Sequence, residues 1–181
     1  MVGSNPAIVT KREHIMAQIL VYNPIKQDGK TVGKKVFLSG TIDDGNSVNW
    51  QSQLIRKLGT TELIKEPLTV FNPRRPNWGK LEQDALEEQI NWELDHQEAC
   101  DINLMVLMGD SKSPISLLEM GLFAKSGKLV VLCPETFYRF ENVRVTCLKY
   151  DITLYYKNKD FSVDEIVEIL ADEIDERNGR A

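Results

Sequence analysis

Two short runs that are apolar at every position except Asn103 constrain the fold of this chain most strongly. Ile102–Met108 and Leu129–Cys133 have the length of strands, and neither alternates with polar residues. A strand that is apolar throughout must be covered on both faces, which is typical of parallel sheets joined by crossover helices. Segments with helical apolar spacing lie before, between and after the two runs. The sequence therefore predicts an α/β fold, a three-layer sandwich with a mainly parallel sheet.

The rest of the chain continues this alternation of strands and helices. The candidate strands are Ala17–Ile25, Lys35–Leu38, Pro67–Phe71 and Ile152–Tyr156, and the candidate helices are Val48–Leu58, Leu81–Ala99 (with an apolar stripe at Leu86, Ile90 and Leu94), Ser116–Lys125 and Val163–Asp175. The first residues, to about Arg12, are expected to form a loose end. We divide the chain into an N-terminal extension with a possible extra strand, residues 1–33, and one α/β domain, residues 34–181.

Composition and charge exclude several classes of protein. The chain has 181 residues, of which 42% are hydrophobic and 27% charged, as in ordinary globular domains and unlike disordered or collagen-like chains. It carries 22 Lys and Arg against 27 Asp and Glu, for a formal net charge of −5. A chain with a net negative charge has no overall attraction to nucleic acid or to anionic lipid. We therefore expect neither as a partner, and no apolar run approaches the roughly 20 residues of a membrane span.

Cysteine usage and the N-terminus predict a cytoplasmic location. Cys100, Cys133 and Cys147 lie in or beside apolar runs without CxxC spacing, which favours buried free thiols in a reducing compartment. The first residues contain no apolar core of a signal peptide. His14 and His96 are far apart and show no metal-ligand spacing, and the GxGxxG, GxxxxGK[ST] and GxSxG motifs are missing from the sequence. We expect no metal and no cofactor.

Polar segments follow the carboxyl ends of the predicted strands, where α/β sheets bind ligands. These segments are Ser39–Gly45, Asn72–Arg75, Gly109–Ser113 and Pro134–Asn142. Glu119 follows the third of them, at the start of an otherwise apolar helix. A helix N-terminus favours an anion, whereas apolar neighbours make its ionisation costly, so Glu119 is a candidate nucleophile or general base. Glu119 is also a candidate helix cap, and the pattern alone favours this second interpretation.

Two further groups of residues have a functional and a structural interpretation. Gln89 and Glu93 lie four residues apart beside Trp92 and can present one face to a small polar ligand, or simply form a solvated helix face. Arg74 and Arg75, close to Trp78, can bind a phosphate or stack on a base, or can be surface charges on a rigid proline turn.

Together these segments resemble the nucleoside 2-deoxyribosyltransferase-like family over roughly Lys34 to Tyr156. The resemblance is carried by Val36–Ile42, Trp50, Asn72–Arg75, Trp78, Gln89-x2-Trp92-Glu93, Ala99-x-Asp101, Pro114–Gly121, Gly127-Lys128 and Glu141–Val143. It implies a flavodoxin-like or Rossmann-like fold, a homo-oligomer, and cleavage of the N-glycosidic bond of a small-molecule deoxynucleoside or nucleotide. The deoxyribosyl group would pass to another base or to water.

The resemblance also implies roles for individual residues. Glu119 would be the nucleophile that attacks C1′ of the sugar, and Glu93 would handle the base or a proton. Asn142 would reach a sugar hydroxyl, often from a neighbouring subunit. The remaining substrate-binding residues that we expect are Ser39, Gly40 and Thr41, which would line the sugar pocket, and Asn72 and Arg75.

The sequence departs from the family pattern at two places. Ser113 or Lys112 stands where transferase relatives commonly have an aspartate, and Asp43-Asp44-Gly45 stands where hydrolases of nucleoside monophosphates have a Gly-Gly-Arg-type loop. Two acids would repel a 5′-phosphate. These departures leave a non-catalytic nucleotide-binding or sensing protein as the alternative. A third alternative is a partner-binding domain that docks through the acidic helix at Val163–Asp175.

Overall fold

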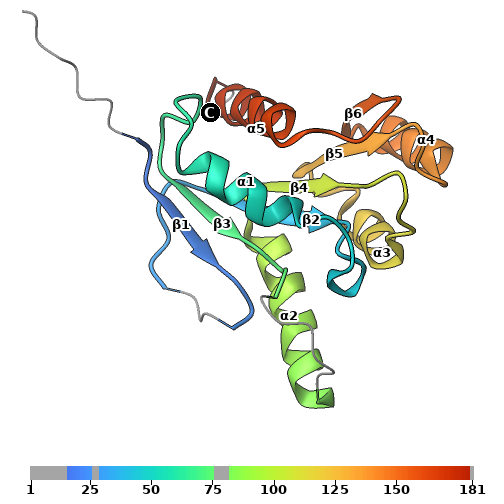
Figure 1. The fold of residues 1–181 in the computed structure, drawn as a ribbon, viewed down its shortest axis with the longest axis horizontal. Coiled ribbons are helices and arrows are strands. Elements are labelled where there is room, and N and C mark those ends of the chain that lie inside the picture. The colour runs from blue at the N-terminus through green and yellow to red at the C-terminus, as the bar shows by residue number, and fades with distance from the viewer. Residues whose placement is uncertain (1–15, 26–28, 76–81, 180–181) are drawn as a thin grey trace, which may run out of the picture.

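A parallel sheet of six strands forms the centre of the protein (Figure 1). The computed structural model describes residues 16–25, 29–75 and 82–179. The sheet order is β1-β3-β2-β4-β5-β6, and every neighbouring pair is parallel. The strands are β1 (Ile19–Tyr22), β2 (Lys34–Gly40), β3 (Leu68–Phe71), β4 (Ile102–Val106), β5 (Leu129–Pro134) and β6 (Thr153–Lys157).

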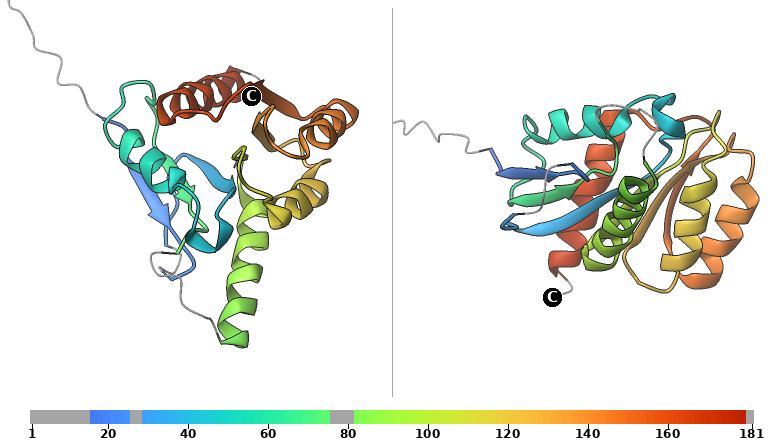
Figure 2. Two further views of the ribbon diagram at one scale, coloured as in Figure 1. Left: turned by 45° about the vertical axis from the view of Figure 1, so that its right-hand side comes forward. Right: turned by 90° about the horizontal axis from the view of Figure 1, so that it is seen from below.

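Helices cover both faces of the sheet, which confirms the predicted three-layer sandwich (Figure 2). One layer holds α1 (Trp50–Leu58) and α5 (Val163–Gly179), and the other holds α2 (Gln83–Ala99), α3 (Pro114–Phe123) and α4 (Phe140–Tyr150). A short 3-10 helix, η1 (Asp43–Gly45), follows β2. The acidic helix α5 buries Ile166, Val167 and Leu170 in the core of its layer.

Alternate side chains of the central strands enter opposite layers, which explains the continuous apolar runs. In β4, Leu104 and Val106 pack in the cluster that contains Trp50, whereas Met105 packs in the cluster that contains Met120. All of these side chains are buried. Because both faces of β4 are covered, no position in it is left for a solvated polar side chain. The one polar residue of β4, Asn103, is itself buried and hydrogen-bonded.

The strand order reverses between β2 and β4. From β2 the chain crosses to β3 on one side, then returns to β4 on the other. In open α/β sheets the ligand crevice lies at such a switch point, beyond the carboxyl ends of the strands. Here those ends are Gly40 and Val106, which are paired in register. Gly40 has φ +123°, and a Cβ at this position would lie 2.1 Å from the carbonyl oxygen of Val106.

The structure corrects several expectations. Helix α4 was not predicted, although its buried Val143 and Cys147 follow helical spacing. Helix α3 begins at Pro114 rather than Ser116. The predicted apolar stripe of α2 is wrong at Leu86 and Ile90, which are both 47% exposed, because the first turns of α2 extend beyond the sheet (Figure 1).

At the N-terminal side, β1 lies at the sheet edge and pairs with β3. The division of the chain at residue 33 stays a prediction. The expected loose end at residues 1–12 and the side chain of Trp78 lie outside the described residues. The three cysteines are buried and free, as expected. None of the helices that the structure describes has the length and apolar character of a membrane span.

The close approach of β2 and β4 predicts a large cost for any side chain at Gly40. We expect Gly40→Ala to lower the free energy of unfolding by at least about 2 kcal/mol, because the new Cβ meets backbone and the φ angle is unfavourable. Gly121→Ala is the matched control, since a Cβ there meets nothing within 4 Å. In a helix that exchange is neutral or stabilising by up to about 1 kcal/mol. Urea unfolding of both variants checks this, and equal stabilities would contradict it.

Candidate active site

Glu119 lies in the middle of α3, on its buried face beside Ser116 and Met120. Its side chain is only 9% exposed. The Oε1 atom accepts a hydrogen bond of 2.8 Å from Nε2 of Gln97, at the end of α2. The expectation that Glu119 occupies the helix start is therefore wrong, and so is the alternative that it caps the helix. A carboxyl group in mid-helix gains little from the helix dipole, so its environment is set by burial and by its neighbours.

Burial raises the pKa of Glu119 to about 7. The hydrogen bond from Gln97 opposes this shift, and the charge of Glu93 adds to it. Glu93 is half-buried on α2, and burial also raises the pKa of its carboxyl, against a hydrogen bond of 2.8 Å from Gln89. Two carboxyl groups from different helices are thus within electrostatic reach of each other. Such pairs are typical of sites for acid–base and nucleophilic chemistry.

Ser39 contacts Gln97, the hydrogen-bond partner of Glu119. Ser39 is 1% exposed, and its hydroxyl group faces two amide oxygens, Oε1 of Gln97 at 3.3 Å and Oδ1 of Asn103. Asn103 in turn donates from Nδ2 to Oε1 of Gln97 over 3.0 Å. The hydroxyl group of Ser39 is therefore engaged within the protein. The structure links Ser39 to Glu119 through Gln97, rather than placing it on an open surface.

Thr41 belongs to a row of hydroxyl groups along the carboxyl ends of β2 and β4. Its Oγ1 accepts from the backbone N–H of Met108 at 3.0 Å and lies 2.6 Å from Oγ of Ser113. Ser113 lies 2.8 Å from Oγ of Ser111, which donates to Asp43 over 2.8 Å. The sequence placed Ser113 in a segment at the ligand-binding edge and in the position of an aspartate of relatives, but it did not predict these hydroxyl contacts, because isolated serines carry no spacing signal.

The two neighbouring arginines after β3 have different environments. Arg74 is buried and donates to the backbone oxygens of Ser47, at 2.8 Å, and Gly45, at 3.1 Å. These bonds fix the loop that follows β2, so the guanidinium of Arg74 is already occupied. Asn72 accepts from the backbone N–H of Arg74 at 3.0 Å. Arg75, in contrast, borders two cavities.

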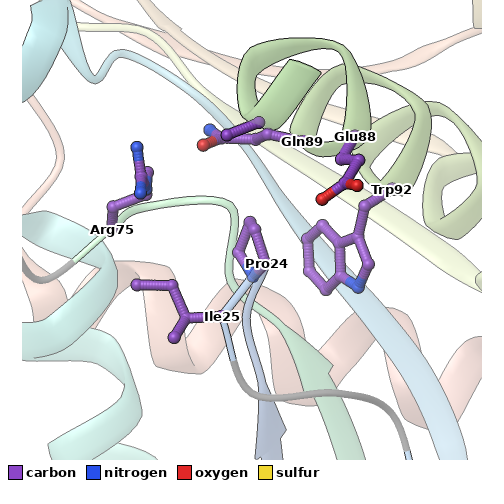
Figure 3. Close-up of a pocket in the computed structure, with 7 residues that line it drawn as sticks. Pro24, Ile25, Arg75, Glu88, Gln89 and Trp92 are labelled. Atoms are coloured by element: carbon purple, nitrogen blue, oxygen red, sulfur yellow. The ribbon is translucent and has the colours of Figure 1, made fainter. Parts of the chain in front are cut away.

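The first cavity has a volume of about 440 Å³ and lies between α2 and the segments that follow β1 and β3 (Figure 3). Arg75, Gln89 and Trp92 line it, together with Pro24, Ile25, Ala85 and Glu88. Nε of Arg75 and Oε1 of Gln89 are buried and lack a hydrogen-bond partner among the described residues. A donor, an acceptor and an indole ring around one cavity suit a planar heterocycle. Gln89 connects this cavity to Glu93, which lies one helical turn further along α2.

The second cavity has a volume of about 460 Å³ and is polar. Asn72 and Arg75 line it, together with Ser47 from the loop before α1 and Asn49 at the start of α1. The structure therefore brings the predicted residues Asn72 and Arg75 together. Neither of these two cavities includes Glu119 or Glu93 among its lining residues.

The predicted site residue Asn142 does not line either of these cavities. It is exposed on α4 and lines a cavity of about 340 Å³ between α3 and α4, with Leu117, Met120 and Tyr138. No hydrogen bond among the described residues joins it to Glu119 or its partners. Nor does the described part of the chain contain a group of three or more His, Cys, Asp or Glu side chains placed to hold a metal ion.

Comparison with known protein families matches the chain to the family described as nucleoside 2-deoxyribosyltransferase like, over residues 33–137. This span is more than half of the chain. The chain belongs to the nucleoside 2-deoxyribosyltransferase-like family. Membership confirms the resemblance, and the matched span includes Glu93 and Glu119, whereas Asn142 lies beyond it. No curated protein matches the chain.

The raised pKa of Glu119 predicts a pH dependence of stability. The proton on Glu119 stabilises the folded state fully below a pH of about 4.5, and this contribution is lost as the pH rises to the folded-state value of about 7. We therefore expect the stability of the wild type, relative to Glu119→Gln, to fall by about 3 kcal/mol between pH 4.5 and pH 8. Denaturant unfolding of both proteins across this range provides the difference. A flat difference would show that Glu119 titrates normally.

Proposed function

We propose that this protein cleaves the N-glycosidic bond of a 2′-deoxynucleoside through a covalent intermediate on Glu119. One observation carries the proposal: the carboxyl group of Glu119 is buried, held by Gln97, and accompanied by a second carboxyl group on Glu93. Membership of the family supports it. No metal and no cofactor enters the proposed reaction.

In the first step, a carboxylate oxygen of Glu119 forms a bond to C1′ of the sugar while the bond from C1′ to the base nitrogen breaks. The electron pair of that bond stays on the base, which takes a proton from Glu93. In the second step, water or a nitrogen of a second base attacks C1′, the ester bond breaks, and Glu93 accepts the proton that the attacking group releases. This is the double displacement of a retaining glycosidase, applied to a nucleoside.

The environment of the two carboxyl groups suits both roles. Two carboxyl groups in electrostatic contact do not ionise together easily, so one keeps its proton while the other is charged. Burial raises the pKa of both groups, that of Glu119 to about 7, so the proposed reaction starts from the form in which the proton lies on Glu93 and Glu119 is the carboxylate. Because Glu119 is buried, its charge is weakly screened and stabilises the positive charge that develops on the sugar ring.

We assign the base to the cavity of Arg75, Gln89 and Trp92, and the sugar to the space between this cavity and Glu119. Gly40 and Thr41 would border the sugar with their backbone at the end of β2, with Asn72 on the neighbouring strand end. Ser39 would act indirectly, through Gln97. Because Arg74 is already occupied, Arg75 is the arginine of this segment that we assign to the substrate.

We further propose that the protein forms a homo-oligomer. Ile115, Leu118 and Leu122 follow each other at helical spacing on α3 and are each about 60% exposed. They form an apolar stripe on the side of α3 opposite the buried face that holds Glu119. A second copy that covers this stripe could supply Asn142 to the sugar, which would explain why one chain keeps Asn142 apart from Glu119.

We expect both Glu119→Ala and Glu119→Gln to lose at least about 1,000-fold in the rate of base release, because no other group can take the place of the nucleophile. Glu168→Gln, at an exposed position of α5, is the matched control and is expected to keep the wild-type rate. The proteins are incubated with each deoxynucleoside and its 5′-monophosphate, with and without a second free base, and the products are separated by chromatography. Circular dichroism verifies that the variants are folded. Full turnover by Glu119→Gln would refute the proposal.

The same assay distinguishes the second candidate function, binding without turnover. One observation favours it: the cavity that suits a base is lined by Arg75, Gln89 and Trp92, and by neither carboxyl group. A nucleoside that raises the melting temperature of the protein while no free base appears would support this candidate. It would also assign the cavity, rather than Glu119, as the centre of the function.

The oligomer is tested by light scattering after size exclusion. We expect the wild type to elute with a multiple of its chain mass of 20.6 kDa, and the double variant Leu118→Lys, Leu122→Lys to elute as a monomer with reduced base release. Two buried charges at an interface are costly, which is the reason for dissociation. Val48→Lys, equally exposed but on the other face of the sheet, is the control. A monomeric wild type would refute the oligomer.

A further inference from the structure

We propose that Gln97 is a positioning residue, which holds the carboxylate of Glu119 in one orientation through an amide that the central sheet orients. This inference rests on the proposed role of Glu119 as nucleophile, and it adds a residue that neither the sequence patterns nor the family match assigns. Gln97 is fully buried at 0% exposure, although glutamine is ordinarily a surface residue. Its burial therefore needs an explanation, and its side-chain hydrogen bonds join it to Glu119 and to Ser39 and Asn103 of the sheet.

The first step of the argument is the direction of the Gln97 amide. Its Nε2 donates to Oε1 of Glu119 over 2.8 Å, and its Oε1 accepts from Nδ2 of Asn103 over 3.0 Å. The opposite orientation would place the amide oxygen against a carboxylate oxygen and the NH2 group against the NH2 group of Asn103. Both contacts would be repulsive. The amide thus presents a donor to Glu119, which is the group that a carboxylate requires.

The second step is what holds Asn103. This residue lies in β4 and pairs with Phe37 of β2 on one side and Leu129 of β5 on the other. Its Oδ1 accepts the hydroxyl proton of Ser39, so Nδ2 is left to face Gln97. A side chain fixed in a central strand cannot rotate as a loop residue can. The orientation of the Glu119 carboxylate is therefore determined by the most rigid part of the fold.

The third step concerns the groups that act on the charge of Glu119. From α2, Glu93 disfavours the charge and Gln97 favours it, while burial disfavours it further. From β2 and β4, Ser39 and Asn103 face the amide and are uncharged. Among the described residues, Gln97 is thus the group that offsets burial and Glu93. Without it, the carboxylate would be both less ordered and harder to ionise.

The test is Gln97→Met, which keeps the volume and removes the amide. We expect kcat for base release to fall at least 10-fold with KM changed less than about threefold, because the change affects the nucleophile and not substrate contacts. We also expect the acid limb of the pH–rate profile to move up by at least about one pH unit. The control is Gln51→Met on α1, since Gln51 is likewise a fully buried glutamine with hydrogen bonds to the Thr41 carbonyl and Arg74. Its acid limb should stay in place.

A second measurement does not depend on catalysis. The difference in unfolding free energy between a protein and its Glu119→Gln counterpart, measured as a function of pH, reports the titration of Glu119. We expect the midpoint of this titration to lie at a higher pH in the Gln97→Met background than in the wild type. If Gln97→Met does not fold, the side-chain amide signal of Gln97 in NMR spectra of the wild type replaces this comparison. That signal should titrate with the Glu119 midpoint and become pH-independent in Glu119→Gln.

The outcomes separate the two proposals. A raised midpoint without any base release would support the positioning role and refute the proposed function. An unmoved midpoint, or equal shifts in Gln97→Met and Gln51→Met, would refute the positioning role even if Glu119 is the nucleophile. A Gln97 side-chain amide signal whose chemical shift does not change with pH in the wild type would refute the positioning role as well.

Discussion

The hydrogen-bonded ladder between β2 and β4 is the constraint on which the rest of the structure depends. It joins the two strands at which the order of the sheet reverses, so every segment that leaves their carboxyl ends starts from one place. Helix α2 leads into β4 and α3 follows it, and therefore both helices carry their inner side chains to the same edge. The ladder is close enough at its end that Gly40 admits no side chain. Backbone geometry, rather than any single contact, thus places Glu93 and Glu119 within reach of each other.

Burial of the site follows from the same architecture. The sheet is covered on both faces, so a carboxyl group on the inner side of α3 is removed from water whether or not it has a partner. A carboxyl group in that position must either keep its proton or receive a donor. Burial raises the pKa of Glu119 to about 7, the hydrogen bond from Gln97 opposes this rise, and the charge of Glu93 adds to it. A group with such a pKa is available in both protonation states near neutral pH, which general acid–base and nucleophilic steps require.

How much of this the sequence could predict depends on the kind of signal. The apolar runs of β4 and β5 predicted the parallel sheet, because coverage on both faces leaves an apolar pattern without alternation. Glu119 stood out for the related reason that it is a charge among apolar residues. Gln97 gave no such signal, since a glutamine among the acids of α2 looks like part of a solvated helix face. The apolar spacing of Leu86 and Ile90 predicted burial that the structure does not show. Periodicity indicates which residues share a helix face, but not whether the sheet extends beneath that face.

In the proposed site, substrate recognition and the chemical step depend on different elements, as Arg74 and Arg75 illustrate. The two residues are adjacent, but their side chains have different surroundings. Arg74 binds the backbone of the loop after β2, near the charge of Asp43, and stabilises the rim of the site. Arg75 is left to the cavities, where its Nε lacks a partner among the described atoms. The carboxyl groups come from α2 and α3, whereas this donor comes from the end of β3. Under the proposed function, a change at Arg75 would therefore alter which base is accepted without moving Glu119.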